Sequence, residues 1–346
     1  MTHLTRSPVL MRAALIPATL VLFVLVSGFL AQAPWATGLW PWPAKPLSYI
    51  FIASILAAIA VPVLWIAITG EAAAIRAGAL DLTVMYGGMF IYILSLIGNP
   101  HEPRLWPYAL ASGLAAAGSA GAFLFARQIP WADPRSMPQP VRLSFGAFAM
   151  ILIGAGVALL LHASIFPWQL GPETSVMFGL IFLGAATYFM YGALDPHWGN
   201  AVGQLAGFLA YDLVLLAPYL ERFSTAQGGP LISLIIYVAF LVYSGALASY
   251  YLFASKTTRI RLALVGSELL PRLTQAMLTY GELLAGSVAQ GMILSSEASG
   301  RSLSRAATTQ RRDCRLRSAR EIGRYAWFAK LSRDGYACLV MKILCV

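Results

Sequence analysis

One carboxylate stands out in the apolar part of the sequence: Asp212, in the segment LAYDLVLLAPYL. It lies deep in a long apolar run, and no Lys or Arg occurs at a matching depth in any other run. A charged side chain is costly at membrane depth, so an ionisable residue there is a candidate for function. We therefore expect Asp212 to be protonated or hydrogen-bonded. The polar residues that could pair with it are Tyr211, Gln204 and Tyr188.

Asp212 permits two interpretations. As a proton-coupling or cation-binding carboxylate, it would lie beside a transport pathway with Tyr211 and Gln204 close by. As a neutral side chain, it would only tie two helices together through a hydrogen bond. Asp81 lies near the start of another apolar run, and we interpret it as an acidic residue near a helix N-terminus, where the helix dipole favours negative charge. Asn200 is interpreted as a helix cap.

Patterns for other chemistry are missing from the sequence. There is no phosphate-binding G-x-x-x-x-G-K-[ST] loop, no H-E-x-x-H zinc motif and no G-x-S-x-G nucleophile motif. Bis-histidine haem needs facing histidines at matching depth, and only His162 falls in an apolar run. The other three histidines are His3, His101 and His197. We expect no metal and no cofactor, name no catalytic residue and lean against an enzyme.

The composition predicts an all-α polytopic membrane protein with about eight transmembrane helices. Of the 346 residues, 59% are hydrophobic and 11% are charged, whereas soluble domains are about a quarter charged. Long apolar runs recur, and each can cross roughly 30 Å of hydrocarbon as a helix. The predicted spans are Ala13–Leu30, Ser48–Thr69, Ala79–Ile97, Pro107–Phe125, Leu143–Ile165, Thr174–Leu194, Asn200–Leu220 and Leu231–Phe253.

The loop charges predict the orientation of these spans. Most Lys and Arg fall on one side, which includes Arg76, Arg127 and Arg135, and such a bias marks the cytoplasmic side. Both termini are then cytoplasmic, and the membrane is the plasma (inner) membrane of a bacterium. An alternative for the first span is a cleaved signal peptide, because AQA at 31–33 resembles a cleavage site. Cleavage would leave seven spans in the same orientation.

A proline-rich turn occurs twice and indicates an internal duplication. WPWPAKPLS (40–48) and FPWQLGPET (166–174) share an aromatic-Pro-Trp-x-x-x-Pro-x-[ST] pattern, offset by about 126 residues. Ser48 and Thr174 are predicted to cap the helices that follow. Trp42 and Trp168 are predicted to anchor the ends of these helices in the membrane interface. The prolines of the two turns are Pro41, Pro46, Pro167 and Pro172.

Four spans per copy is an even number, so the two copies form parallel four-helix repeats. The predicted divisions are an N-terminal arm (1–12), the first repeat (13–126), a cytoplasmic linker (127–142), the second repeat (143–254) and a basic tail (255–346). Residues 256–346 hold 15 of the 24 Lys and Arg but only 6 of the 14 Asp and Glu. The three cysteines lie there without a C-x-x-C pair.

Two interpretations of the tail stay open. It is either an interfacial amphipathic helix followed by an arginine-rich segment that contacts anionic lipid headgroups, or a terminus out of its native reading frame. We expect membrane lipids as partners, and a protein partner or a second copy of the chain. We expect no nucleic acid, because no recognised fold supports it.

The repeated Pro-Trp turns, with the segment from Phe178 to Leu220, resemble an uncharacterised family of bacterial multi-pass integral membrane proteins. The resemblance covers roughly residues 35–252 and implies a membrane location without an assigned activity. Our leading hypothesis is a small-molecule or lipid transporter with Asp212 near the pathway. The alternative is a non-catalytic membrane subunit or scaffold that holds a partner membrane protein. A weaker alternative is an intramembrane lipid-modifying enzyme.

Overall fold

The computed structural model describes residues 7–97 and 105–258. These residues form helices and contain no β-strand. The helices are α1 (Ser7–Leu30), α2 (Pro34–Thr37), α3 (Pro46–Thr69), η1 (Ala72–Ala74), α4 (Ile75–Leu96), α5 (Trp106–Ala126), α6 (Gln139–Leu160), α7 (Pro172–Leu194), α8 (Trp198–Arg222), α9 (Gly229–Ser249) and the π-turn η2 (Tyr250–Ala254).

The all-helical membrane fold is confirmed. In the described part of the chain, seven helices are long and apolar enough to cross a membrane. The first helix, α1, has 24 residues, and its shorter apolar stretch covers Ala14–Leu30. The predicted fifth span was wrong at its end, because α6 ends at Leu160 and the residues up to Ile165 form a loop. This loop later proves to line a pocket.

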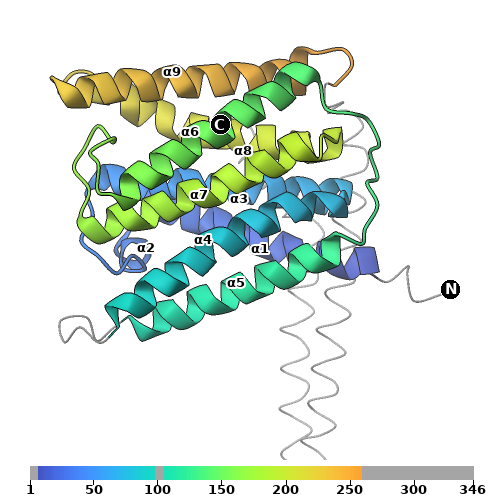
Figure 1. Cartoon of the computed structure of the whole chain (residues 1–346), viewed down its shortest axis with the longest axis horizontal. Coiled ribbons are helices and arrows are strands. Elements are labelled where there is room, and N and C mark those ends of the chain that lie inside the picture. Colours follow the sequence, from blue (N-terminus) through green and yellow to red (C-terminus); the bar gives the residue numbers. More distant parts are fainter. Residues whose placement is uncertain (1–6, 98–104, 259–346) are drawn as a thin grey trace, which may run out of the picture. The chain divides into compact units, whose positions relative to one another are not determined.

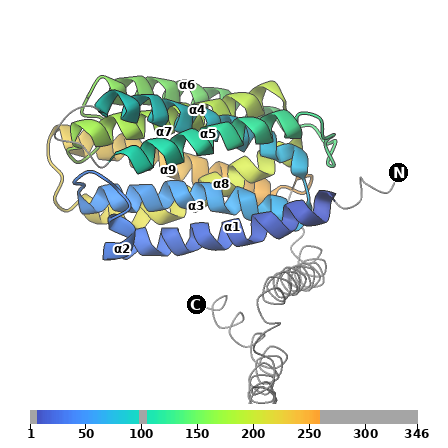
Figure 2. The ribbon, with the colours of Figure 1, turned by 90° about the horizontal axis from the view of Figure 1, so that it is seen from below.

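The helices pack in two layers of four (Figure 1, Figure 2). In one layer α3 packs between α1 and α8, and α9 packs on α8. In the other layer α4 packs between α5 and α7, and α6 packs on α7. Each layer therefore combines helices from both predicted repeats. If α1, α3, α4 and α5 are matched to α6, α7, α8 and α9, every one of these helix pairs maps onto another, as a two-fold relation requires.

The helix bounds repeat with the spacing that the sequence predicted. The start of α3 at Pro46 and the start of α7 at Pro172 differ by 126, and so do the ends of α4 at Leu96 and of α8 at Arg222. The first helices end alike, because Gln32 and His162 both adopt a left-handed conformation. The four-residue helix α2 is an insertion in the first turn. The chain therefore contains two parallel four-helix repeats.

The two proline turns exchange hydrogen bonds across the repeats. Trp168 Nε1 donates to Ser48 Oγ at 2.9 Å, and Trp40 Nε1 donates to Thr174 Oγ1 at 3.4 Å. The prediction that Ser48 and Thr174 cap their helices was wrong. Both helices start two residues earlier, after Lys45 and Gly171, and neither has a side-chain cap. Pro46 and Pro172 begin these helices, because proline suits the first helical position.

The tryptophans of these turns lie inside the protein. Trp42 and Trp168 are buried, and Trp168 packs against Phe166 and Tyr219. The expected contact of Trp42 and Trp168 with the membrane interface is therefore not made. Exposed indole rings at this end belong instead to Trp35 and Trp106. We call this end of the bundle, formed by residues 30–46, 161–171 and 223–228, the aromatic end.

The opposite end is held together by the linker between the repeats, and we call it the basic end (residues 70–76, 127–142, 195–198 and 254–258). The linker pairs with the α7–α8 turn, since Met137 N donates to Pro196 O and Trp198 N donates to Arg135 O, both at 2.7 Å. The buried carboxylate of Glu71 accepts the backbone N–H groups of Ala132 and Asp133 at 3.1 and 2.8 Å. The linker thus ties the equivalent turns of both repeats.

Candidate functional site

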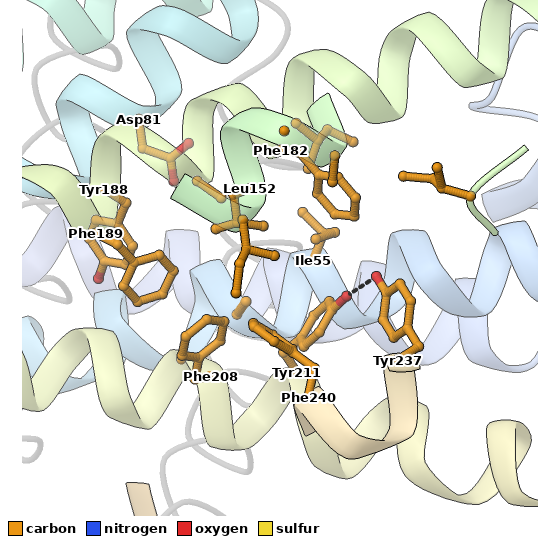
Figure 3. Close-up of a pocket in the computed structure, with 18 of the residues that line it drawn as sticks. Ile55, Asp81, Leu152, Phe182, Tyr188, Phe189, Phe208, Tyr211, Tyr237 and Phe240 are labelled. Atoms are coloured by element: carbon orange, nitrogen blue, oxygen red, sulfur yellow. Dashed lines mark hydrogen bonds between the residues drawn. The ribbon is translucent and has the colours of Figure 1, made fainter. Parts of the chain in front are cut away.

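A pocket of about 530 Å³ lies between the two layers of the described bundle (Figure 3). Residues from α3, α4, α6, α7, α8 and α9 line it, and most of them are aliphatic or aromatic. Pockets of this size and character, with a few convergent polar groups, are typical of small-molecule sites. The polar residues of the lining are Asp81, Ser164, Tyr188, Gln204, Tyr211, Ser233 and Tyr237.

The pocket lies where the two repeats meet. Four pairs of lining residues are separated by 126 positions, so each pair occupies equivalent places in the two repeats. These pairs are Ile55 with Ile181, Ile59 with Ala185, Asp81 with Gly207, and Met85 with Tyr211. Ligand sites of membrane proteins built from repeats commonly lie at such an interface. The pocket is therefore a product of the duplication, although its lining is not symmetric.

Asp81 is the carboxylate that faces this pocket (Figure 3). Its prediction as a helix-start charge was wrong, because α4 begins at Ile75 and its first turn has no acidic residue. Asp81 lies close to α7 only because residue 184 is glycine: a Cβ at Gly184 would lie 2.5 Å from Asp81 Oδ1. Asp81 makes no hydrogen bond or ion pair with any residue that the structure describes.

Two of the three predicted site residues, Gln204 and Tyr211, line the pocket, but they do not pair with the third, Asp212. Gln204 Nε2 donates to the backbone oxygen of Tyr188 at 2.5 Å. The hydroxyl groups of Tyr211 and Tyr237 lie 2.6 Å apart at the other end of the pocket (Figure 3). The pocket therefore has an acidic end at Asp81 and a hydroxyl end at Tyr211. Between them lie apolar side chains such as Phe182 and Ile55.

Asp212 does not line the pocket. It is buried between α8 and α9, where Ser244 Oγ donates to its Oδ1 and Oδ2 at 3.0 and 2.9 Å. Gly245 makes room for this contact, since a Cβ there would lie 3.3 Å from Asp212 Oδ2. The predicted pairing with Tyr211, Gln204 and Tyr188 was wrong. The geometry matches the second interpretation of Asp212, a side chain that ties two helices together.

The pocket reaches the lateral surface of the bundle between α6 and α9. Near the basic end these helices touch, with Ser144 Oγ and Tyr243 Oη 2.8 Å apart and Phe148 packed on Phe240. Further toward the aromatic end, exposed side chains of both helices belong to the lining, such as Ile151 (54% exposed) and Ile236 (66% exposed). We call this opening the lateral mouth.

A second pocket of about 360 Å³ lies at the aromatic end. Its lining includes His162, Trp168 and Ser175, and it shares Ser164 with the larger pocket. Ser164 is exposed in the loop after α6. The two pockets therefore meet at a loop residue of the aromatic end. No described residue of the basic-end loops lines either pocket.

The basic end carries a polar network that the sequence did not suggest as a unit. The Arg76 guanidinium donates to the backbone oxygens of Ala126 and Ile129, lies 3.6 Å from Asp195 and stacks over Trp131. Trp131 in turn stacks on the ring of His197. Nearby, hydrogen bonds from Arg135 hold the pKa of the Asp133 carboxyl below its ordinary value. This network closes the basic end over both repeats.

Within residues 7–97 and 105–258, no group of three or more His, Cys, Asp or Glu is placed to hold a metal ion. His101 and residues 259–346 of the predicted tail lie outside the described residues. The sequence does contain one signal that could have drawn attention to Asp81. The equivalent position in the second repeat, 126 residues later, is Gly207, which shares a helix face with Gly203.

Comparison with protein-family models, curated proteins and solved structures finds no match to this chain.

Proposed function

We propose that the protein is a transporter that carries an amphipathic small molecule or a lipid through the pocket between its repeats. The observation that carries this proposal is the set of four equivalent residue pairs in the pocket lining. A site shared by two related halves can be exposed to either side when one half moves against the other.

The lateral mouth supports an apolar or amphipathic substrate. Exposed pocket residues of α6 and α9 would face lipid in a membrane, so a molecule dissolved in the bilayer reaches the pocket without crossing water. The shared residue Ser164 gives a second connection, toward the aromatic end. The hydrogen bonds that Glu71 and Arg76 make with the linker region hold the basic end closed. This arrangement is one state of an alternating-access cycle in our proposal.

The orientation follows from the arginines of the basic end. Arg76, Arg127 and Arg135 lie at this end, and short loops rich in Lys and Arg stay in the cytoplasm. We therefore propose a plasma membrane location with the basic end cytoplasmic. The start of α1 and the end of η2 lie at that same end of the bundle (Figure 1), so both termini are cytoplasmic in this proposal.

A pair of variants on one helix tests the proposal. Gly154 lines the lateral mouth, whereas Gly146, two turns earlier in α6, does not. A Cβ at either residue meets no described atom within 4 Å. Gly154→Trp should fill the mouth, and Gly146→Trp should only add an indole to the outer face of α6. Both variants and the wild type would be studied by native mass spectrometry in lipid nanodiscs.

The expected result is a small molecule or one selected lipid that remains on the wild type and on Gly146→Trp but is absent from Gly154→Trp. Flux of that molecule into proteoliposomes should follow the same order. A protein in fixed ratio with the wild type, with no retained molecule and no flux, would contradict the transporter. It would favour the alternative of a subunit that holds a partner membrane protein.

A further inference from the structure

We propose that the pocket binds a lipophilic cation, an apolar molecule with a single positive charge, and that Asp81 is its counter-charge. This inference rests on the proposed function, because it names the substrate class of the same pocket. Three features carry it: the charge of the lining, the aromatic side chains around the pocket, and the opening toward lipid.

The carboxyl group in the lining has no charged partner among the described residues. Asp81 is the acidic residue among the described residues that line the pocket, and none of those residues is Lys, Arg or His. The arginine nearest to it in sequence, Arg76, is occupied by Asp195 and the linker. An ionised carboxylate in apolar surroundings is costly without a partner. A bound cation supplies that partner, whereas a bound anion would add repulsion.

The aromatic side chains suit the same kind of molecule. Tyr188 and Phe189 lie beside Asp81 in the pocket, and Phe208 lies across from them (Figure 3). Phe189 and Phe208 stack with ring centroids 4.2 Å apart. The face of an aromatic ring attracts a cation, more strongly when water is excluded. Apolar groups of the ligand would fill the remaining space between Phe182 and Phe240.

The length of the pocket also sets how far apart two polar groups of the ligand would lie. Gln204 marks the acidic end and Tyr211 marks the hydroxyl end, seven positions apart on α8, which corresponds to about 10 Å along a helix. A cation held at Asp81 could therefore place a polar atom at the Tyr211–Tyr237 pair. The lateral mouth admits molecules that partition into the bilayer, as lipophilic cations do.

Binding of tetraphenylphosphonium to the full chain in phosphatidylcholine nanodiscs tests this assignment. Tetraphenylborate is the matched probe, because it has nearly the same shape and the opposite charge. Equilibrium dialysis of each labelled ion against protein-loaded and empty nanodiscs gives the specific binding. Asp81→Asn removes the charge and keeps the shape, and Asp212→Asn is the control at a second buried carboxylate.

We expect the wild type to bind the phosphonium ion specifically and to leave the borate ion unbound. Asp81→Asn should lower the affinity for the cation at least about tenfold, since removing one partner of a buried charge pair is costly. Asp212→Asn should change it by less than about threefold. Wild-type affinity in Asp81→Asn, or equal binding of both ions by the wild type, would overturn the proposal.

A second measurement uses only the wild type, so it does not depend on the folding of a variant. Dicyclohexylcarbodiimide modifies carboxyl groups in apolar sites, and peptide mass spectrometry locates the adduct. Saturating phosphonium should slow the modification of Asp81 at least tenfold, and unprotected labelling would count against the cation site.

The failure of this inference can be distinguished from failure of the transporter. If a neutral lipid is retained and Gly154→Trp displaces it, the cation-binding proposal fails while the transporter proposal stands. If neither the cation nor any retained molecule depends on Gly154, both proposals fail.

Discussion

The two repeats share a backbone plan and differ in where they place a carboxylate. Asp81 of the first repeat is equivalent to Gly207 of the second, and Asp212 of the second is equivalent to Tyr86 of the first. Asp81 faces a pocket and makes no hydrogen bond to the described residues, whereas Asp212 accepts two contacts from Ser244. Duplication thus gives both repeats the same backbone arrangement. Single polar residues at equivalent positions then decide which repeat contributes a carboxylate to the pocket.

Access to the pocket is asymmetric in the same way. Helices α6 and α9 of the second repeat contribute to the lining, but no described residue of their equivalents α1 and α5 does. The lateral mouth therefore opens on one flank of the bundle. Glycines permit both acid contacts, with Gly184 against Asp81 and Gly245 against Asp212. The comparison between the repeats can be tested at the turns, at these glycines and at the hydrogen bonds between helices.

The largest effect is expected at the turns of the basic end, where Glu71 and His197 are equivalent. Glu71→Ala removes the acceptor of two backbone N–H groups and should lower the free energy of unfolding by about 3 kcal/mol. His197→Ala removes a stacked ring from Trp131 and should cost about 1 kcal/mol. Equilibrium unfolding in mixed micelles measures both. Glu71→Gln, which keeps one acceptor, should fall between them, and a smaller loss for Glu71→Ala than for His197→Ala would contradict the assignment.

The next effect separates the two glycines. A Cβ at Gly184 would lie 2.5 Å from Asp81 Oδ1 and 2.8 Å from Met85 Cβ, so Gly184→Ala must push α4 from α7. We expect a loss of about 2 kcal/mol. Gly245→Ala meets Asp212 Oδ2 at 3.3 Å, which a small movement relieves, and should cost less than about 0.5 kcal/mol. Equal losses in thermal unfolding would show that the two acids are packed alike.

Much of this fold could be predicted from the sequence, because its signals are local. Apolar run lengths fix the helices to within a few residues, and the Pro-Trp turns reveal the duplication. The starts of α3 and α7 were misplaced by two residues because Pro46 and Pro172 can begin a helix themselves. Ser48 and Thr174 are then free to accept hydrogen bonds from tryptophans of the other repeat. A contact between repeats leaves no local pattern.

The candidate site was harder to predict than the fold. Depth in the sequence selected Asp212, but depth does not say which face of a helix meets a pocket and which meets a neighbouring serine. Asp81 was passed over because it lies near a predicted span end, yet η1 and α4 begin earlier and carry it two turns into the helix. Gln204 and Tyr211 were predicted beside Asp212 but line the pocket instead, and their partners, Tyr188 O and Tyr237, depend on packing between helices.

A double-mutant cycle sharpens the contrast between the acids at the level of one hydrogen bond. Asp212→Asn, Ser244→Ala and the double variant should give a coupling energy of roughly 1 to 2 kcal/mol, because the pair is buried and in contact. Asp81→Asn combined with Ser244→Ala should be additive, since Ser244 contacts Asp212 and not the pocket acid. Coupling between Asp81 and Ser244 would contradict the separation of the two sites.

The smallest effect compares the two reciprocal tryptophan bonds. Trp168 Nε1 is buried and lies 2.9 Å from Ser48 Oγ, so Ser48→Ala leaves a buried donor without its acceptor and should cost about 1 kcal/mol. Trp40 Nε1 is half-buried and lies 3.4 Å from Thr174 Oγ1, near the limit of a hydrogen bond. Thr174→Val should then cost only about 0.3 kcal/mol. Equal costs in chemical unfolding would mean that the bonds are energetically symmetric, and the asymmetry of the bundle would begin at the pocket and not at the turns.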